Sequence, residues 1–409
     1  MQTNLTAQFQ ASLEGQEAEQ ILRSCVHCGF CNATCPTYQL LGDELDGPRG
    51  RIYQIKQVLE GQEVTRSTQL HLDRCLTCRN CETTCPSGVE YSRLLDIGRK
   101  LVEERVPRPF AEQLQRSVLA NTLPRRWIFT PAVKAGQLLR PLLPRNLQAK
   151  LPVRNTPSAW PKRSQARQML LLEGCVQPAL LPNVNAATAR VLDALGVQVL
   201  RVAKAGCCGA LRHHLNQQEA ALDDARRNID AWWPLLQQNQ QIEAIISNAS
   251  GCGVMLKDYG HLLRHDAAYS AKAQQIASLV RDLSEVLPAF TPKLKALLPT
   301  TPTLKLAYHP PCTLQHGQQL KGQVETLMTA LGFSLKHCAD SHLCCGSAGT
   351  YSILQPQLAT QLRDNKLKNL LPAEGIISAN IGCQMHLQSG TEVPVRHWIE
   401  VLDAALHGA

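Results

Sequence analysis

Short apolar runs recur in the C-terminal part of the chain, in an order that occurs twice. Each copy has an apolar strand segment, then a helical segment that ends at glycine, and then a second apolar strand segment. These segments are 168–174, 192–196 and 245–247 in the first copy, and 305–308, 328–332 and 376–378 in the second. Strand, helix, strand, helix, strand is the order of a parallel α/β unit. We therefore expect a duplicated α/β domain, with copies at 168–300 and 301–409.

The first 110 residues have a helical pattern instead. Apolar residues at 52, 55, 58 and 59 recur at helical spacing and predict a helix over 51–60. Residues 14–23 predict another helix. We expect residues 1–110 to form a separate, helical domain. With the duplicated α/β domain that follows it, the predicted fold class is α+β/α/β.

A basic, proline-rich linker is expected at 111–167. Residues 121–167 contain seven prolines and ten Lys or Arg but no Asp or Glu, so they carry the whole surplus behind the net charge of +9. The prolines predict that no long helix forms here. A basic segment with interleaved leucines could lie peripherally on an anionic membrane, or pack on a protein surface, and both alternatives stay open. The ten basic residues are Arg125, Arg126, Lys134, Arg140, Arg145, Lys150, Arg154, Lys162, Arg163 and Arg167.

Two copies of one cysteine pattern lie in the N-terminal domain. Each reads C-x2-C-x2-C-x3-C-P, the run that holds four-iron clusters in bacterial two-cluster ferredoxins, where the fourth cysteine binds the cluster of the other run. By that rule one [4Fe-4S] cluster has the ligands Cys25, Cys28, Cys31 and Cys85, and the second has Cys75, Cys78, Cys81 and Cys35. Zinc is the alternative, but a third cysteine and a proline in each run exceed what zinc needs. Arg49 and Arg51, at the start of the helix between the runs, fit a solvated helix end, or they could pair with a partner carboxylate or tune a cluster.

A second set of cysteines follows the predicted strands of each α/β copy. Because loops after parallel strands gather at one edge of a sheet, the four thiols of each copy can meet at one place. They predict a candidate third site at Cys175, Cys207, Cys208 and Cys252, and a candidate fourth site at Cys312, Cys344, Cys345 and Cys383. Four thiols at one place favour iron–sulfur clusters or another metal, although buried apolar cysteines or redox thiols without metal are alternatives. Cys338 has no counterpart, and His213, His214, His316 and His342 near these loops could assist or simply pack.

Composition limits the remaining possibilities. No apolar run approaches the ~18 residues that a membrane helix needs, and the polar residues 1–20 predict no signal peptide. We expect a cytoplasmic protein, whose 17 cysteines are metal or redox ligands rather than disulfides. The chain lacks a G-x-G-x-x-G dinucleotide fingerprint, and we expect no catalytic residue, no other cofactor-binding residue and no nucleic-acid partner.

The C-terminal copies resemble the cysteine-rich domain of heterodisulfide reductase subunits. That family has a cysteine, then Cys-Cys-Gly, then Cys-x2-Cys. Here Met255 and His386 stand at the last cysteine of the two copies, so the resemblance leaves four thiols in each, and His386 could contribute a ligand in the second.

The whole arrangement resembles a narrower group of iron–sulfur subunits, those of glycolate oxidase (glycolate dehydrogenase), anaerobic glycerol-3-phosphate dehydrogenase and lactate-utilisation proteins. The segments 25–36, 47–52, 75–86 and 248–253 look most like the glycolate oxidase subunit. The resemblance implies an electron-transfer subunit that works with FAD-containing partner subunits, which oxidise glycolate to glyoxylate, and that passes electrons to a quinone at the cytoplasmic face of the inner membrane. The alternatives are a glycerol-3-phosphate or lactate dehydrogenase subunit, a self-contained disulfide reductase, and a zinc-stabilised scaffold.

Overall fold

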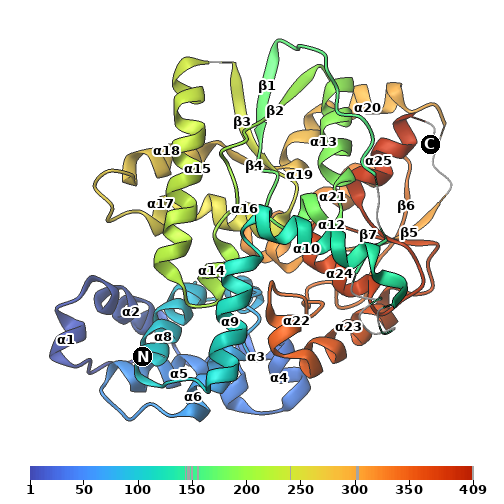
Figure 1. Ribbon diagram of the computed structural model, residues 1–409. Helices are drawn as coiled ribbons and strands as arrows, with labels where there is room; N and C mark the ends of the chain where they lie inside the picture. The colour runs from blue at the N-terminus through green and yellow to red at the C-terminus, as the bar shows by residue number, and fades with distance from the viewer. Residues whose placement is uncertain are drawn as a thin grey trace. The chain divides into compact units, whose positions relative to one another are not determined.

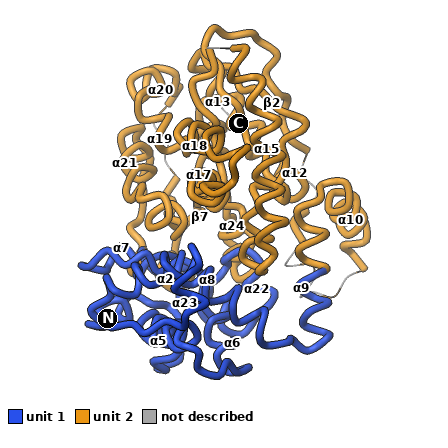
Figure 2. Tube along the Cα trace, turned by 90° about the vertical axis from the view of Figure 1, so that its left-hand side faces the viewer, with its two compact units in different colours: residues 1–117, 342–366 blue, residues 118–341, 367–409 orange. Residues whose placement is uncertain are grey.

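The computed structural model of the chain divides into two compact units (Figures 1 and 2). The first comprises Met1–Ser117 and His342–Lys366, and the second comprises Val118–Ser341 and Leu367–Ala409. The structure describes residues 1–142, 144, 148, 151–153, 156–239, 241–300 and 304–407. Of the predicted basic residues, Arg145, Lys150 and Arg154 lie outside the described residues. The four-part division expected from the sequence stays a prediction, since the two units follow a different partition.

The first unit is helical. Its elements are α1 (Ala7–Gln10), α2 (Leu13–Ser24), α3 (Phe30–Ala33), α4 (Pro36–Leu41), the 3₁₀ turn η1 (Glu44–Asp46), α5 (Pro48–Leu59), α6 (Arg66–Asp73), α7 (Asn80–Thr84), α8 (Tyr91–Arg105) and α22 (Tyr351–Leu354). Two helices cross the boundary between the units, α9 (Phe110–Thr122) and α23 (Pro356–Leu370). The helices predicted at 14–23 and 51–60 are thus confirmed as α2 and α5.

The core of the first unit holds α5 against α8. The apolar positions that predicted α5 are all buried, and they share a cluster with Leu94 and Leu95 of α8. The two helices approach closely at Gly98, where a Cβ atom would lie only 2.5 Å from Cγ1 of Ile55. Helix α5 is therefore fixed in place between the two cysteine loops that flank it in the sequence.

The second unit contains two four-stranded parallel sheets, with the orders β2-β1-β3-β4 and β6-β5-β7-β8. The strands are β1 (Arg167–Leu171), β2 (Val197–Arg201), β3 (Ile242–Ser247), β4 (Val280–Asp282), β5 (Lys305–His309), β6 (Ser334–Lys336), β7 (Gly375–Ser378) and β8 (Val395–His397). Every pairing is parallel, and the two sheets have the same order along the chain. The predicted fold class, a helical cluster domain followed by a duplicated α/β domain, is confirmed, and each copy adds a fourth strand that the sequence pattern did not indicate.

Helices cover both sheets (Figure 1). The first copy has α12 (Gln177–Leu180), α13 (Asn183–Ala194), α14 (Ala210–His214), α15 (Gln218–Gln238), α16 (Ser250–Lys257), α17 (Tyr259–Leu262), α18 (Ser270–Leu279), α19 (Leu283–Val286), η3 (Leu287–Phe290) and α20 (Thr291–Leu297). The second has the π-helical turn η4 (Thr313–Gly317), α21 (Gln323–Ala330), α24 (Ile381–Gln388) and α25 (Trp398–His407). Helices α13 and α21 are each followed by a left-handed glycine, Gly196 and Gly332, as the sequence predicted.

The two copies share one hydrophobic core. Leu171 and Val199 of the first sheet lie in the same buried cluster as Tyr308 and Ile377 of the second. A guanidinium–carboxylate pair also joins α13 to α25, with Arg190 Nε 2.9 Å from Asp403 Oδ1. The parts of the two repeats that belong to the second unit therefore share one core rather than forming two independent domains.

Part of the expected linker is helical. Helix α10 (Arg126–Leu138) runs for 13 residues and contains Pro131, so the expectation that the prolines exclude a long helix is wrong here. The reason is their spacing, because between Pro124 and Pro141 only Pro131 interrupts the run. Within the described residues, no helix is both long and apolar enough to cross a membrane.

A buried histidine joins the two copies. His397, at the end of β8, accepts a hydrogen bond from the Ile399 N–H at Nδ1 over 3.1 Å, so its proton is on Nε2, which donates to the Asn248 carbonyl over 2.9 Å. Burial lowers the pKa of His397 to about 3. Asp282 ends the corresponding strand β4, and burial raises its pKa to about 6.

These pKa shifts predict opposite effects on stability. An unfolded histidine has a pKa of about 6.5, so the unfolded chain binds more protons below that pH and stability falls on acidification by up to ~1.4 kcal/mol per unit. Asp282 favours the folded state as the pH falls from about 6 towards 4. We expect His397→Asn, which can keep the helix cap, to flatten the decline of stability between pH 6.5 and 4, and Asp282→Asn to steepen it. Chemical denaturation across this range measures both, and parallel profiles for the two variants would contradict the assignment.

Candidate metal centres

Both cysteine loops of the first unit have the same backbone conformation. His27 and Gly29 in the first loop have φ values of 59° and 87°, and Thr77 and Arg79 at the same positions of the second loop have 51° and 59°. Left-handed residues in such turns direct backbone N–H groups into a concavity that binds anions, as at many iron–sulfur sites. Accordingly the Thr77 N–H donates to Sγ of Cys75 over 3.4 Å. The loops are therefore shaped to surround a sulfur-bearing group.

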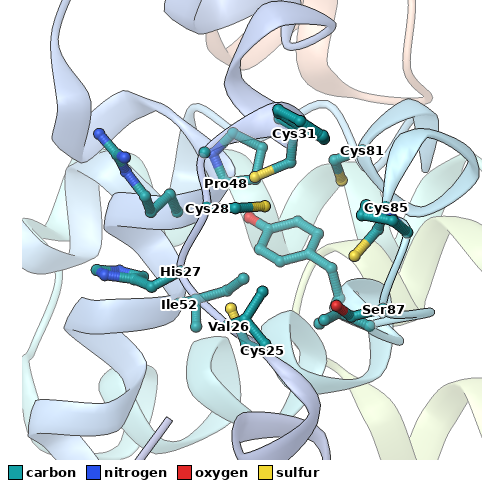
Figure 3. A pocket seen from close by; sticks show the side chains of 16 residues that line it. Cys25, Val26, His27, Cys28, Cys31, Pro48, Ile52, Cys81, Cys85 and Ser87 are labelled. Atoms are coloured by element: carbon teal, nitrogen blue, oxygen red, sulfur yellow. The ribbon is translucent and has the colours of Figure 1, made fainter.

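The first set of four cysteines lines one cavity. Cys25, Cys28 and Cys31 come from the first loop and Cys85 comes from the end of the second, and Figure 3 shows their sulfur atoms around a shared space. Burial raises the pKa of the Cys31 thiol to about 11, and it also raises the pKa of Cys25. Such thiols stay protonated near neutral pH unless a cation compensates their charge.

The second set lines a neighbouring cavity. Cys35 comes from the first loop, and Cys75, Cys78 and Cys81 come from the second. Burial raises the pKa of Cys81 well above its ordinary value. Cys81 and Tyr91 line both cavities, so the two sites are adjacent.

The donor set of these cavities fits iron–sulfur clusters. Metal binding deprotonates thiols, which supplies the compensation that burial demands. Each cavity combines thiols of both loops, with Cys81 and Cys85 of the second loop in the first cavity and Cys35 of the first loop in the second cavity. Such mixing is expected of the crossed arrangement of two four-iron clusters. Each crossed set also joins the two loops covalently once a cluster is bound.

Arg51 is not at a solvated helix end, so that interpretation is wrong for this residue. Its side chain is only 1% exposed, it lines the second cavity, and its Nη2 lies 3.3 Å from Oδ1 of the buried Asp46. The sequence hid this arrangement because η1 packs tightly on α5, where a Cβ atom at Gly50 would lie 2.1 Å from the Glu44 carbonyl oxygen. Arg49 does remain partly exposed and pairs with Glu44 at 2.6 Å.

The first α/β copy brings its four cysteines together. Cys175 follows β1, Cys207 and Cys208 follow β2, and Cys252 lies in α16 after β3. Hydrogen bonds from the Cys175 and Cys208 thiols hold the pKa of Cys207 well below its ordinary value, and Cys208 also interacts with Cys252. The Gly209 N–H donates to Sγ of Cys207 over 3.4 Å. This group of thiols at the carboxyl edge of a parallel sheet can hold a metal or cluster.

Sequence reasoning missed the polar residues that support this group. Asn228 donates from Nδ2 to the Cys207 carbonyl over 2.8 Å, and the Tyr259 hydroxyl donates to the Cys208 carbonyl over 2.9 Å. Both side chains are fully buried. They lie on α15 and α17, 20 residues after Cys208 and seven residues after Cys252, outside the cysteine motifs, so the motifs did not indicate them.

The cysteines of the second copy are divided between the two units. Cys312 and Cys383 belong to the second unit, and Cys344 and Cys345 belong to the first. The Gly346 N–H donates to Sγ of Cys344 over 3.4 Å, which reproduces the geometry of the first copy. The candidate fourth site therefore stays a prediction.

The remaining sequence candidates are not assigned a ligand role. Met255 is buried in the same core cluster as Cys208, and His386 is half-buried. Cys338 is half-buried and donates to the carbonyl oxygen of Ala339 over 3.2 Å. Among the histidines near the loops, His316 is buried, and the half-buried ones are His213, His214 and His342.

Comparison with known proteins assigns the chain to a family. Residues 21–89 match a family model described as a 4Fe-4S dicluster domain, and residues 169–257 and 306–388 match one described as a cysteine-rich domain. The chain is 56% identical over 409 residues to the glycolate oxidase iron–sulfur subunit of Escherichia coli K12, with 99% of each chain covered. The chain belongs to the family of glycolate oxidase iron–sulfur subunits.

Other members and relatives agree with this assignment. The probable glycolate oxidase iron–sulfur subunit of Bacillus subtilis 168 is 30% identical, with 94% of this chain and 92% of that protein covered. Lactate utilization protein A of an Exiguobacterium species is 26% identical, but the match covers only 58% of this chain, although it covers 96% of that protein. Membership in the family and the two domain types establish an iron–sulfur protein with an electron-transfer role in an oxidoreductase complex.

The crossed ligand sets predict the loss of one cluster from each of two variants. Cys28→Ser should remove the cluster of the first cavity and Cys78→Ser that of the second, because serine is a poor ligand for iron. Iron and acid-labile sulfide on anaerobically purified protein should each fall by about four per chain. Cys338→Ser is the matched control and should lose neither. Unchanged iron in both loop variants would refute the ligand assignment.

Proposed function

We propose that this chain is the electron-transfer subunit of a glycolate-oxidising complex. Its partner subunits carry FAD and oxidise glycolate to glyoxylate, and this chain passes the electrons towards a quinone-type acceptor. The observation that carries the proposal is the pair of adjacent cavities, which are lined between them by eight cysteines from two loops, in a chain that aligns over 99% of its length with a glycolate oxidase iron–sulfur subunit.

The residues around the cavities define what this chain contributes. We propose that Cys25, Cys28, Cys31 and Cys85 hold one [4Fe-4S] cluster. The other has the ligands Cys35, Cys75, Cys78 and Cys81. When bound, such clusters accept and release single electrons. The chain holds the thiols in fixed positions, excludes water with apolar walls and places the two sites next to one another.

The substrate chemistry then takes place on the partner. Oxidation of glycolate removes two electrons and two protons, and a flavin can accept both electrons before it releases them singly. Glycolate is favoured over lactate as the substrate because the resemblance to the E. coli subunit covers 99% of this chain, whereas lactate utilization protein A covers 58%.

The surface beside the first cavity supports contact with a partner there. Cys28 is exposed, unlike the buried Cys25. Val26 and Phe30 next to it are 68% and 62% exposed, and Tyr53 is also exposed. An apolar surface around an accessible ligand suits contact with a flavin subunit. Such contact would bring the flavin close to the cluster.

Further clusters in the α/β copies are part of the proposal. The four thiols of Cys175, Cys207, Cys208 and Cys252 interact with one another, which supports a third site. By the repeat, the fourth site has the ligands Cys312, Cys344, Cys345 and Cys383. About eight irons per chain would mean that only the first unit carries clusters, and about sixteen would mean that both copies do as well.

We also propose that the chain works at the cytoplasmic face of the inner membrane, held there by the segment 121–167. Helix α10 and the turn after it expose Trp127, Leu138 and Leu142, beside the exposed Arg125 and Lys134. Apolar and basic side chains on one surface segment suit an anionic lipid interface. Arg126 has an internal role instead, because it pairs with Glu173 at 3.3 Å and donates to the Gly174 carbonyl.

Reduction by glycolate tests the proposed electron path. Clusters of the purified chain should stay oxidised when glycolate is added alone, and should be bleached within the mixing time when FAD-containing glycolate oxidase subunits are added. Lactate and glycerol 3-phosphate with the same subunits are the controls. Bleaching by glycolate without any partner would refute the proposal that the substrate is oxidised on the partner subunits. Bleaching by lactate but not by glycolate, with the same subunits, would mean that lactate is the substrate.

Removing the exposed residues of the basic segment should weaken membrane binding. We expect Arg125→Gln/Lys134→Gln/Trp127→Ser to reduce sedimentation with phosphatidylglycerol-containing vesicles at least fivefold at low salt, and salt to weaken wild-type binding. Lys293→Gln, a basic residue outside the segment, is the control. If the triple variant sediments like the wild type, the segment packs on protein instead.

A further inference from the structure

A buried arginine lies beside the second cavity. Arg51 is the second charged residue of α5, after Arg49, and it lines the cavity of Cys35, Cys75, Cys78 and Cys81. Its Nε donates to the His71 carbonyl over 2.7 Å, and its Nη1 donates to Oγ1 of Thr37 over 3.2 Å. These bonds fix the position of the guanidinium and leave it no access to solvent.

The carboxylate that compensates this charge belongs to a residue that does not line the cavity, although the backbone carbonyl of that residue, Asp46, lies 3.8 Å from Sγ of Cys35. Asp46 pairs with Arg51 at 3.3 Å, with Arg74 at 2.8 Å and with Nδ1 of His71 at 3.1 Å, but it does not line the cavity. The exposed Asp43 lies close to the same group. The positive end of the buried ion pair therefore faces the cysteines.

A second buried guanidinium acts on the same cysteine loop. Arg99 donates from Nη2 to the carbonyl oxygens of Leu72 and Cys75, each over 2.8 Å. Its side chain is buried as well. Charge in a buried place acts strongly on its neighbours because water does not screen it.

Two hydroxyl groups approach the thiols of this set. The Tyr91 hydroxyl donates to Sγ of Cys75 over 3.6 Å, and Oγ1 of Thr37 lies 3.3 Å from Sγ of Cys35. Oγ1 of Thr37 also lies 2.8 Å from the Asp46 carbonyl oxygen, to which it donates. A Cys35 thiolate can only accept, so it competes with that carbonyl for the Thr37 proton. Hydrogen bonds to ligand sulfur stabilise the more negative state of a cluster.

The surroundings of the first cavity differ. Arg49 lines that cavity and is about one-third exposed, and its charge is cancelled by Glu44 at 2.6 Å. Sγ of Cys31 is directed at Oδ1 of Asn32, 3.9 Å away, which is an acceptor and not a donor. Two residues apart on one helix, Arg49 and Arg51 thus serve different cavities in different dielectric surroundings.

We propose that Arg51, together with Tyr91 and Thr37, raises the reduction potential of the second cluster above that of the first. The step concerned is the gain of one electron by the cluster, with no bond formed or broken and no proton transferred. That electron makes the cluster more negative, so a buried positive charge and donated hydrogen bonds favour the reduced form. The second site then retains the electron, and the exposed first site exchanges it. This inference rests on the ligand sets proposed above.

Redox titration monitored by electron paramagnetic resonance tests this difference. The full chain with its clusters is poised anaerobically with dithionite and mediators, in a Cys28→Ser background that keeps the second cluster and in a Cys78→Ser background that keeps the first. We expect the second cluster to be reduced at the higher potential. Arg51→Gln should lower its reduced-to-oxidised ratio at least tenfold at fixed potential, which is a shift of about 59 mV for one electron.

Milder variants keep the test decisive if Arg51→Gln does not fold. Tyr91→Phe and Thr37→Val each remove one hydroxyl and should lower the same ratio severalfold, and Arg51→Lys should retain most of the wild-type potential. Arg49→Gln is the matched control, and it should change the ratio of the first cluster less than threefold and leave the second unchanged.

The outcomes separate this inference from the proposed function. If the Cys28→Ser and Cys78→Ser variants keep all their iron, the ligand sets are refuted. If each background loses one cluster as expected, but the two potentials are equal or Tyr91→Phe and Thr37→Val leave the second unchanged, the inference alone is wrong. A shift of the first cluster by Arg51→Gln would also overturn it.

Discussion

The structure of the first unit depends on eight cysteines that line two small cavities, four of which are buried. Burial raises the pKa of Cys25, Cys31 and Cys81, so these groups become good ligands only when a cation takes the place of their protons. The left-handed residues of both loops, the donated N–H groups and the helix between the loops all serve this requirement. With the proposed ligand sets, folding of the loops is coupled to binding of the clusters, because neither cavity is lined by cysteines from one loop alone.

The same constraint explains the architecture of the second unit. Its thiols follow the strands of a parallel sheet, which gathers loops from distant parts of the sequence at one edge. Buried polar side chains such as Asn228 and Tyr259 then fix the loop carbonyls by hydrogen bonds. The shared core and the hydrogen bond of His397 to Asn248 join the copies within the second unit.

The sequence predicted the features that recur in it and missed those that depend on packing. Cysteine spacing and paired apolar runs gave the fold class, the strands before each cysteine and the sets that line both cavities. The burial of Arg51 could not be predicted, because it results from the close approach of η1 to α5 at Gly50 and from a carboxylate, Asp46, outside any motif. Helix α10 was missed for a related reason, since a proline count ignores where the prolines lie.

The contrast between Arg49 and Arg51 shows how one short helix can distinguish two sites that have the same ligands. Both guanidiniums begin from the first turns of α5, yet one pairs with Glu44 in contact with solvent and the other is sealed beside Cys35 and Cys75. Coulomb interaction at a fixed distance is several times stronger in the buried case, so the difference between the sites arises from burial and not from the sequence of the cysteine runs. On our proposal that Arg51 raises the potential of the second cluster, a repeated ligand motif yields two unequal sites, and the path of an electron gains a direction that the motif alone does not contain.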